Sequence, residues 1–511
     1  MAKVKTVIIS LVTLIAGLVY THVYPCDVAV VSARASSTGR PFIWKSRDCS
    51  ANWHQEIKYF PAATTKAGAF IMVIGFDDLA NFNTGSKVNP SGGVNEAGFA
   101  IACTSVYEDL NPIHEAVNVN TDLIRHGLEQ CATIGDFEAY LGVWRRDHLG
   151  KVISGNFAAI DAKGGAAMYE CYTGNTGGTF NPIRWRKTDA NTGKITETYS
   201  GYTRVIDKGT GDNFIGFVNL TNSNAYITYN YGEERRWRAA DIFTELKSTG
   251  RLNYRNCMVE VTKDVYGQQI DGNGRQLDQA SCQSDYSTTY CISRNQTRLG
   301  LVVDGVASGG DPRLSAFWCV LGEPAAAVYI PYFVAAGGVS WLAYIDDIDM
   351  DGKLYDLNDT SLLARASNRR EMFENLLYDS NYGNVATGME DRNINKLELA
   401  KVQLWTLPLE EFIFRRYEEF MADLSAHSSY ITKDNLRTFV DYCANHVYTN
   451  YNEASATQYA WTYTKPWDTI WYGYTRPGFE NDGLTLQPPL SSQSGSDEGD
   501  GVFNLSKILG Y

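Results

Sequence analysis

The stretch that most constrains this chain runs from Cys26 to Asp48 and reads CDVAVVSARASSTGRPFIWKSRD. A valine-rich run follows the cysteine, a Ser-Ser-Thr-Gly turn comes next, and a second apolar run starts at Pro41. This pattern predicts a β-hairpin that closes on an acidic residue. A chain cut just before Cys26 would carry a thiol and a free α-amine on one residue. Because the amine titrates near pH ~8 and the thiol near ~8.5, the amine can serve as the base for its own side chain.

Residues 1–25 are expected to be a signal peptide or propeptide. Lys3 and Lys5 form a basic start, and the apolar run from Val7 to Val19 is short for a membrane span. Pro25 disfavours a signal-peptidase cut directly before Cys26, so we expect cleavage upstream, between 16 and 21, followed by self-removal of a short propeptide. A lipoprotein signal is the alternative, but the residues before Cys26 lack the small side chain it needs. The chain is therefore predicted to be exported, periplasmic or extracellular.

Composition narrows the class of partner. Of 511 residues, 44% are hydrophobic and 13% aromatic, which is ample for a large core, and the formal net charge is −13. That charge argues against nucleic acid or an anionic membrane surface, and no later stretch predicts stable membrane insertion. Ten cysteines leave disulfides open, with Cys282 and Cys291 able to close a short loop. A homo-oligomer also remains open.

No metal or cofactor is expected. The sequence has no CxxC motif and no histidine pattern with zinc-ligand spacing. The segment from Asp347 to Asp359 begins like a calcium loop, but Asn358 stands where a bidentate glutamate is needed. We interpret it as an acidic surface turn, with a structural calcium site as the alternative.

Periodicity predicts a mixed α+β fold. Strands are expected over 67–78 and 98–107, with a hairpin over 152–162 and 165–174 that turns at Gly164 and Gly165. Helices are expected over 120–131, 133–143, 233–246, 360–377, 397–424 and 434–446, the second opened by a capping box at Thr133 and Asp136. The polar segment 188–198 is expected to be a loop. Two blocks of strands with helices between and after them suit stacked sheets.

Four more stretches carry a family resemblance. They are GGVNEAGFAIACTSV (92–106), GNFAAIDAKGGAAMYE (155–170), GEERRWRAADIF (232–243) and DPRLSAFWCVLGEPAAAVYIPYFVAAG (311–337). Together with the opening segment they resemble N-terminal-nucleophile (Ntn) hydrolases of the cholylglycine hydrolase, or linear-amide C–N hydrolase, group, which are related to penicillin acyl-transferring enzymes. The resemblance implies a four-layer αββα sandwich over 26–420. A helical extension over 421–487 would pack on it, and a disordered tail over 488–511 would follow.

The resemblance assigns the nucleophile and its neighbours. Cys26 would be the nucleophile, although a structural half-cystine is the usual role of a cysteine in an exported protein. Asp48 would orient the α-amine, with a turn acid as the alternative. Lys45 occupies the family's basic position, where an arginine is usual, and Arg47 is a second candidate. Either cation would favour the thiolate by charge attraction, and which of them lies near the thiol stays open. A solvated strand end is the alternative for both.

Three more residues follow from the resemblance. Asn95 and Asn156 match asparagines of the family. The resemblance implies that one donates a hydrogen bond to the oxyanion and that the other holds this donor and the substrate. Turn capping is the alternative role for each. Arg235 matches an arginine that steadies the active-site network. Because Arg236 and Arg238 lie next to it, which of the three arginines matches the family's position stays open. The alternative is that all three form a solvated run of charge on a helix.

The function these residues predict is a secreted cysteine amidohydrolase. Its substrate would be a small-molecule N-acyl amide, whose linear, non-peptide C–N bond it would cleave through an acyl-thioester on Cys26. A dipeptidase-like peptidase or an acyltransferase of the same superfamily is an alternative, and a non-catalytic secreted binding protein on this scaffold is another.

Overall fold

A computed structural model describes most of the chain up to residue 461. The described residues are 26–49, 54–62, 66–76, 89–106, 120–147, 153–173, 183–199, 202–206, 212–214, 216–221, 225–226, 232–265, 286–287, 291–294, 296–340, 343, 378–383, 391–394 and 396–461. The predicted leader, the acidic segment 347–359, the helix expected over 360–377 and the tail over 488–511 lie outside them.

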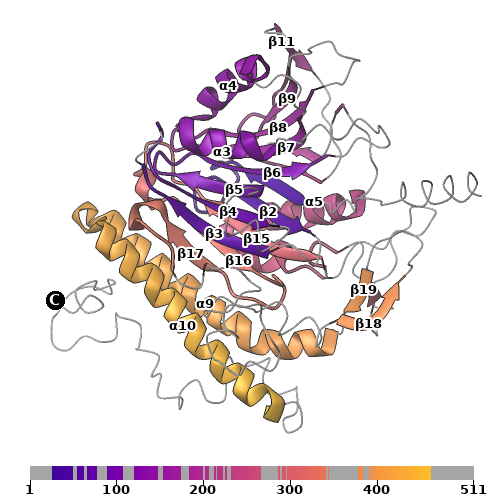
Figure 1. The fold of residues 1–511 in the computed structure, drawn as a ribbon, viewed down its shortest axis with the longest axis vertical. Helices are drawn as coiled ribbons and strands as arrows, with labels where there is room; N and C mark the ends of the chain where they lie inside the picture. The colour runs from indigo at the N-terminus through magenta and orange to yellow at the C-terminus, as the bar shows by residue number, and fades with distance from the viewer. Residues whose placement is uncertain are drawn as a thin grey trace, which may run out of the picture.

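Two antiparallel sheets form the body of the fold (Figure 1). The nine-stranded sheet has the order β11-β10-β9-β8-β7-β6-β5-β4-β3 and the seven-stranded sheet the order β12-β13-β1-β2-β15-β16-β17. The first comprises β3 (His54–Phe60), β4 (Phe70–Phe76), β5 (Asn89–Asn95), β6 (Ala100–Ser105), β7 (Ser154–Ile160), β8 (Ala166–Tyr172), β9 (Arg184–Asp189), β10 (Ile195–Tyr199) and β11 (Tyr202–Ile206). The second comprises β1 (Asp27–Val31), β2 (Phe42–Asp48), β12 (Asp212–Phe214), β13 (Phe217–Leu220), β15 (Thr297–Asp304), β16 (Ala316–Leu321) and β17 (Ile330–Phe333).

Helices and a small third sheet complete the described elements. The helices are α3 (Asn120–Gln130), α4 (Ile134–Asp147), α5 (Glu233–Ser248), α6 (Tyr254–Asn256), the π-helix η2 (Cys257–Thr262), α9 (Lys396–Ala426) and α10 (Lys433–Trp461), with short 3₁₀ turns η4 (Pro312–Leu314), η5 (Val334–Ala336) and η8 (Ser428–Tyr430). The third sheet contains β14 (Tyr286–Ser287), β18 (Tyr378–Gly383) and β19 (Asp391–Ile394).

The predicted opening hairpin is confirmed as β1 and β2, which pair from Asp27 opposite Ser46 to Val31 opposite Phe42. Both strands are buried on both faces, so in β1 an unbroken apolar run after Asp27 replaces the strict alternation of a half-exposed strand. One large hydrophobic cluster fills the space between the sheets and continues to the far side of the seven-stranded sheet. The hairpin therefore lies in the centre of the molecule.

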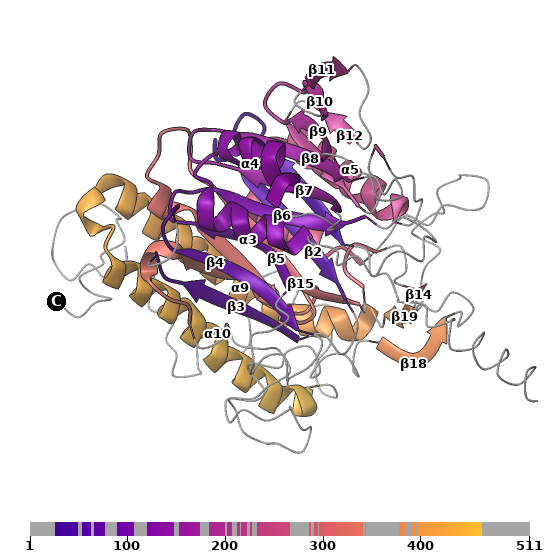
Figure 2. The same cartoon turned by 45° about the horizontal axis from the view of Figure 1, so that its top comes forward.

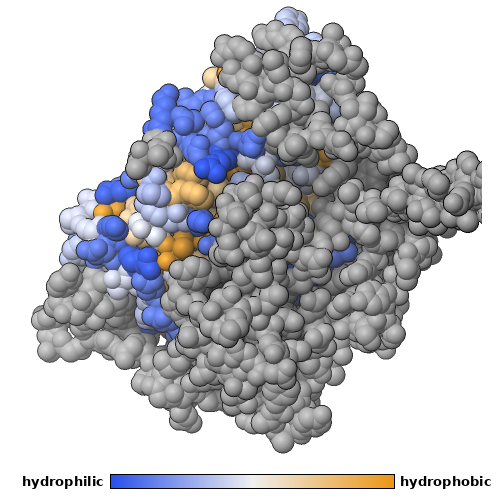
Figure 3. Space-filling view, in the orientation of Figure 1, coloured by the Kyte–Doolittle hydropathy of each residue, from blue (hydrophilic) through white to orange (hydrophobic). Residues whose placement is uncertain are grey.

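Helices α3 and α4 cover the other face of the nine-stranded sheet (Figures 1 and 2). A second hydrophobic cluster lies under them, formed by inward residues such as Leu123, Leu128 and Trp144. The predicted capping box is confirmed: the Asp136 backbone N–H donates to the Thr133 hydroxyl at 3.1 Å, and the Thr133 N–H donates to the Asp136 carboxylate at 2.9 Å. Figure 3 shows hydrophilic side chains gathered on the part of this face where Figure 1 places α4.

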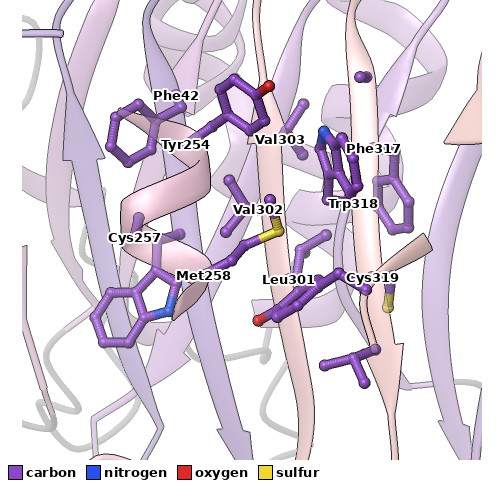
Figure 4. Close-up of a cluster of buried hydrophobic side chains, with 14 of the residues drawn as sticks. Phe42, Tyr254, Cys257, Met258, Leu301, Val302, Val303, Phe317, Trp318 and Cys319 are labelled. Carbon is purple, nitrogen blue, oxygen red and sulfur yellow. The ribbon is translucent and has the colours of Figure 1, made fainter. Parts of the chain in front are cut away.

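The outer face of the seven-stranded sheet is covered by α5, α6, η2 and α9. Figure 4 shows Met258 and Cys257 of η2 and Tyr254 of α6 packed beside side chains of β15 and β16. Tyr254 stacks on Trp318 with ring centroids 5.7 Å apart. This layer fixes α5 against β13 and so positions the arginines at the start of α5.

Three expectations differ from the structure. The segment 188–198, expected to be a loop, is a hairpin of β9 and β10 that turns at Gly193, where φ is +70°. Helix α10 continues well beyond residue 446, to Trp461. The domain boundary expected between residues 420 and 421 lies inside the uninterrupted helix α9. Among the described residues, no helix has the length and apolar character to cross a bilayer.

Candidate active site

Cys26 lies at the start of β1, at one end of the space between the two sheets. Its side chain is half-buried. Its backbone carbonyl accepts a hydrogen bond from the Thr104 hydroxyl of β6, on the opposite sheet, at 3.1 Å. Its thiol donates to the Asp48 carbonyl of the neighbouring strand β2 at 3.9 Å. The first residue of the predicted mature chain is therefore held by both sheets.

The alternation of side chains along β1 and β2 sorts the charged residues onto two faces of the sheet. Because successive residues of a strand point to opposite faces, Cys26, Lys45 and Arg47 belong to the face toward the nine-stranded sheet. Asp27 and Asp48 belong to the outer face, toward the helices. The cations thus share the layer of the thiol, and the carboxylates do not.

Both candidate cations are buried and contact the opposite sheet. The Lys45 ammonium donates to the Cys103 carbonyl, and the Arg47 guanidinium donates to the Ser91 hydroxyl. Burial raises the pKa of the Cys103 thiol to about 11, while Lys45 and Arg47 oppose this rise and Cys26 adds to it. Lys45, Arg47 and Cys26 therefore all lie within electrostatic reach of the Cys103 thiol.

On the outer face, Asp48 forms a fully buried ion pair. The Arg294 Nε lies 2.9 Å from its Oδ2, and both side chains have 0% exposure. The Thr297 hydroxyl donates to Oδ1 at 2.6 Å. Asp48 is thus fixed at the end of β2, and its backbone carbonyl is held next to the Cys26 thiol.

A second buried pair lies beside it, on Asp27. The Arg235 Nε is 3.1 Å from Asp27 Oδ2, and the Thr221 hydroxyl donates to Oδ1 at 2.9 Å. Burial raises the pKa of Asp27; Arg235 offsets part of this effect, and the Asp48 carboxylate adds to it. The two carboxylates therefore influence each other across adjacent strands.

The three arginines at the start of α5 contact different partners. Arg235 faces Asp27, whereas Arg238 pairs with Asp264 at 2.7 Å, away from Cys26. The main-chain carbonyl of Arg236 accepts from Asn219. Of the three, Arg235 belongs to the cluster.

The two predicted asparagines lie in different places. Asn156 pairs with Thr104 across β6 and β7, next to the nucleophile, and its amide donates to the Thr221 carbonyl at 2.9 Å. Asn156 thereby holds the residue whose hydroxyl binds Asp27.

Asn95 is the last residue of β5, just before the turn into β6, and lies opposite Phe99, about 16 Å along β6 from Thr104. Its amide donates to the carbonyls of Leu128 and Cys131 at 3.0 and 2.7 Å, and its Oδ1 accepts from the Phe99 N–H. The structure does not bring Asn95 to the thiol, and its contacts match the alternative of turn capping: it joins the hairpin to the end of α3.

Sequence reasoning missed several members of the cluster, namely Asp27, Thr104, Thr221, Arg294 and Thr297. One signal was available: Asp27 precedes an unbroken apolar run, and a carboxylate there needs a buried cation. Arg294 and Thr297 follow a segment with no regular periodicity, so nothing in the sequence tied them to Asp48.

The described residues hold no cluster of histidine, cysteine and acidic side chains suited to a metal ion. No disulfide joins two cysteines of the described residues, and Cys282, one half of the disulfide considered above, lies outside them.

Comparisons with known proteins give a distant structural likeness. No protein-family model matches the chain, and no curated protein matches its sequence. Among solved structures, the chain is similar to a mutant of the conjugated bile acid hydrolase from Clostridium perfringens. The alignment has 12% sequence identity and a TM-score of 0.30, and it covers 66% of this chain and 98% of that one.

Proposed function

We propose that the chain is an exported cysteine amidohydrolase of the Ntn type. It would cleave linear, non-peptide C–N bonds through an acyl-thioester on Cys26. Its two stacked antiparallel sheets, with helices on both outer faces, fit the αββα sandwich that this mechanism uses. The five sequence motifs described above support the same assignment.

One observation carries the proposal: the charges around Cys26 are sorted by face. The thiol shares its layer with two buried cations, Lys45 and Arg47, and both nearby carboxylates lie on the other face. Each carboxylate is held by its own arginine. A thiolate is therefore met by positive charge and is separated from negative charge by the sheet itself.

The chemistry follows from a mature chain that begins at Cys26. The α-amine takes the thiol proton as sulfur attacks the substrate carbonyl, and a C–S bond forms. The amine leaving group departs with that proton when the C–N bond breaks. Water then adds to the thioester with the α-amine as base, which releases the carboxylic acid and restores the thiol.

Several residues act on this reaction through their neighbours. Thr104 fixes the Cys26 carbonyl, and Asp48 fixes the end of β2 beside the thiol. Asn156 holds Thr221, which in turn binds Asp27. These are positioning residues, because each holds the nucleophile or its strand directly or through one neighbour, and none needs to touch substrate.

The test is hydrolysis of a set of N-acyl 4-nitroanilides by purified protein. We expect release of nitroaniline by the wild type and none by Cys26→Ala. Cys131→Ala is the matched control, since it removes a buried thiol at the end of α3, away from the cluster. Equal activity of the wild type and Cys26→Ala would refute the proposal.

A further inference from the structure

Two parallel rows of side chains run from the candidate active site across the nine-stranded sheet to its edge. The inner row pairs Thr104 with Asn156, then Glu170, Arg186, Glu197 and Arg204 on successive strands. The outer row pairs Ser154 with Tyr172, Arg184, Tyr199 and Tyr202. Figure 2 shows these strands in order from β6 to β11. Since the rows are two residues apart, they share the face on which Thr104 meets Cys26.

The outer row forms a half-exposed aromatic platform around one arginine. The Arg184 guanidinium lies 4.9 Å from the Tyr226 ring centroid and 5.3 Å from that of Tyr199. Tyr226 also stacks on Tyr172 at 6.1 Å. Tyr199 is 39% exposed and the side chain of Arg184 44%. The rings hold the guanidinium in place without using its hydrogen-bond donors.

The Glu197 carboxylate, which is the ion-pair partner of Arg184, forms its shorter hydrogen bonds with other groups. Arg204 donates twice to Glu197 Oε2, at 2.9 and 2.6 Å, and the Tyr226 hydroxyl donates to Oε1 at 3.0 Å. Burial raises the pKa of Glu197, but these hydrogen bonds outweigh it and the pKa lies below its ordinary value. Arg184 reaches Oε1 only at 3.4 Å. Its Nε is buried and makes no hydrogen bond within the described part of the chain.

We propose that Arg184 and the platform of Tyr172, Tyr199 and Tyr226 form a subsite that binds a carboxylate at the far end of the substrate's acyl chain. The subsite rests on the proposed amidase function. It lies three strand spacings from Thr104, about 14 Å. The tyrosine rings offer apolar surface to the chain, and the pre-positioned guanidinium offers donors to the anion. The chain as a whole has a net charge of −13, but the two rows are locally cationic here, because three arginines outnumber two glutamates: Arg184, Arg186 and Arg204 against Glu170 and Glu197.

The test compares two substrates of equal length. One is the mono-4-nitroanilide of dodecanedioic acid, whose extended chain places the carboxylate about 14 Å from the amide; the other is its methyl ester. We expect the wild type to prefer the acid in kcat/KM about 10- to 100-fold, as for a charge-assisted hydrogen bond. Arg184→Gln should remove the preference, and Arg184→Lys should keep part of it.

The matched control is Arg125→Gln on α3. Arg125 is also an exposed arginine, paired with Glu129 at 2.8 Å and lying over the Phe60 ring at 5.8 Å, but on the other side of the sheet. It should leave the preference unchanged. A wild type that cleaves acid and ester equally well would overturn the subsite and leave the amidase standing.

A binding measurement separates the two proposals if neither anilide is cleaved. Dodecanedioate is titrated by calorimetry into Cys26→Ala and into Cys26→Ala with Arg184→Gln. Binding that weakens at least 10-fold in the second protein supports the subsite while the amidase proposal fails. Equal binding, or none, by both proteins refutes the subsite.

Discussion

Replacing Arg294 by methionine should be among the most damaging single changes near the site. Arg294 and Asp48 are both fully buried, with their nitrogen and oxygen 2.9 Å apart. Methionine keeps much of the volume but leaves the Asp48 carboxylate charged in the interior, where the Thr297 hydroxyl still donates to it at 2.6 Å. Breaking a buried pair in this way lowers the free energy of unfolding by about 3–5 kcal/mol.

A double variant tests whether the uncompensated charge of Asp48 causes the loss of stability. Adding Asp48→Asn to Arg294→Met removes the uncompensated charge and keeps the side-chain shape. The double variant should therefore be more stable than Arg294→Met by about 2 kcal/mol, a coupling well beyond additivity. Arg437→Met breaks the exposed pair with Asp441, 2.8 Å apart, and should change stability by about 0.5 kcal/mol or less.

Urea unfolding followed by tryptophan fluorescence measures all four proteins, with m-values compared to confirm that the transition is the same. The reasoning is refuted if Arg294→Met loses less than about 1 kcal/mol, or if the double variant is no more stable than the single one.

Two further predictions concern charge. Burial raises the pKa of Asp304 to about 6, although Arg40 opposes the rise. The folded state therefore keeps a proton on Asp304 that the unfolded state releases near pH ~4. The stability that this proton gives is fully present below pH ~4 and is lost as the pH rises to ~6. Relative to Asp304→Asn, the wild type should therefore lose about 3 kcal/mol between those values, and parallel pH profiles of unfolding would contradict this. Lys45→Met should slow alkylation of Cys26 by iodoacetamide at pH 7 by roughly 10-fold, since it removes a buried cation that shares the thiol's face of the sheet and favours the thiolate. A slowing with Arg47→Met instead would identify the other cation as the one that acts on the thiol.

The parts of the fold that the sequence predicts well are those set by local chemistry. The turn at Gly164 and the capping box at Thr133 depend on residues a few positions apart, and both are present. Strand β5 was missed because Gly92 and Gly93 have no strand propensity. Their place in the sheet comes from close packing, since a Cβ on Gly93 would lie 2.3 Å from the Ile71 carbonyl. Such contacts join distant segments and leave no local pattern.

The site shows the same division. Cys26, Lys45 and Asp48 share one hairpin, so the opening segment alone places them together. Arg294 reaches Asp48 from 246 residues away, and this pairing depends on how β15 docks on β2. Asn95 was assigned to the site from a motif, but its hydrogen bonds to the end of α3 give it a structural role.

The most direct measurement is the mass of the N-terminal peptide of active protein, taken during turnover of an N-acyl 4-nitroanilide and after an acid quench. The account predicts a peptide that begins at Cys26 and carries one acyl group as a thioester. An active chain that retains residues ahead of Cys26, or an acyl group found on another residue, would contradict it.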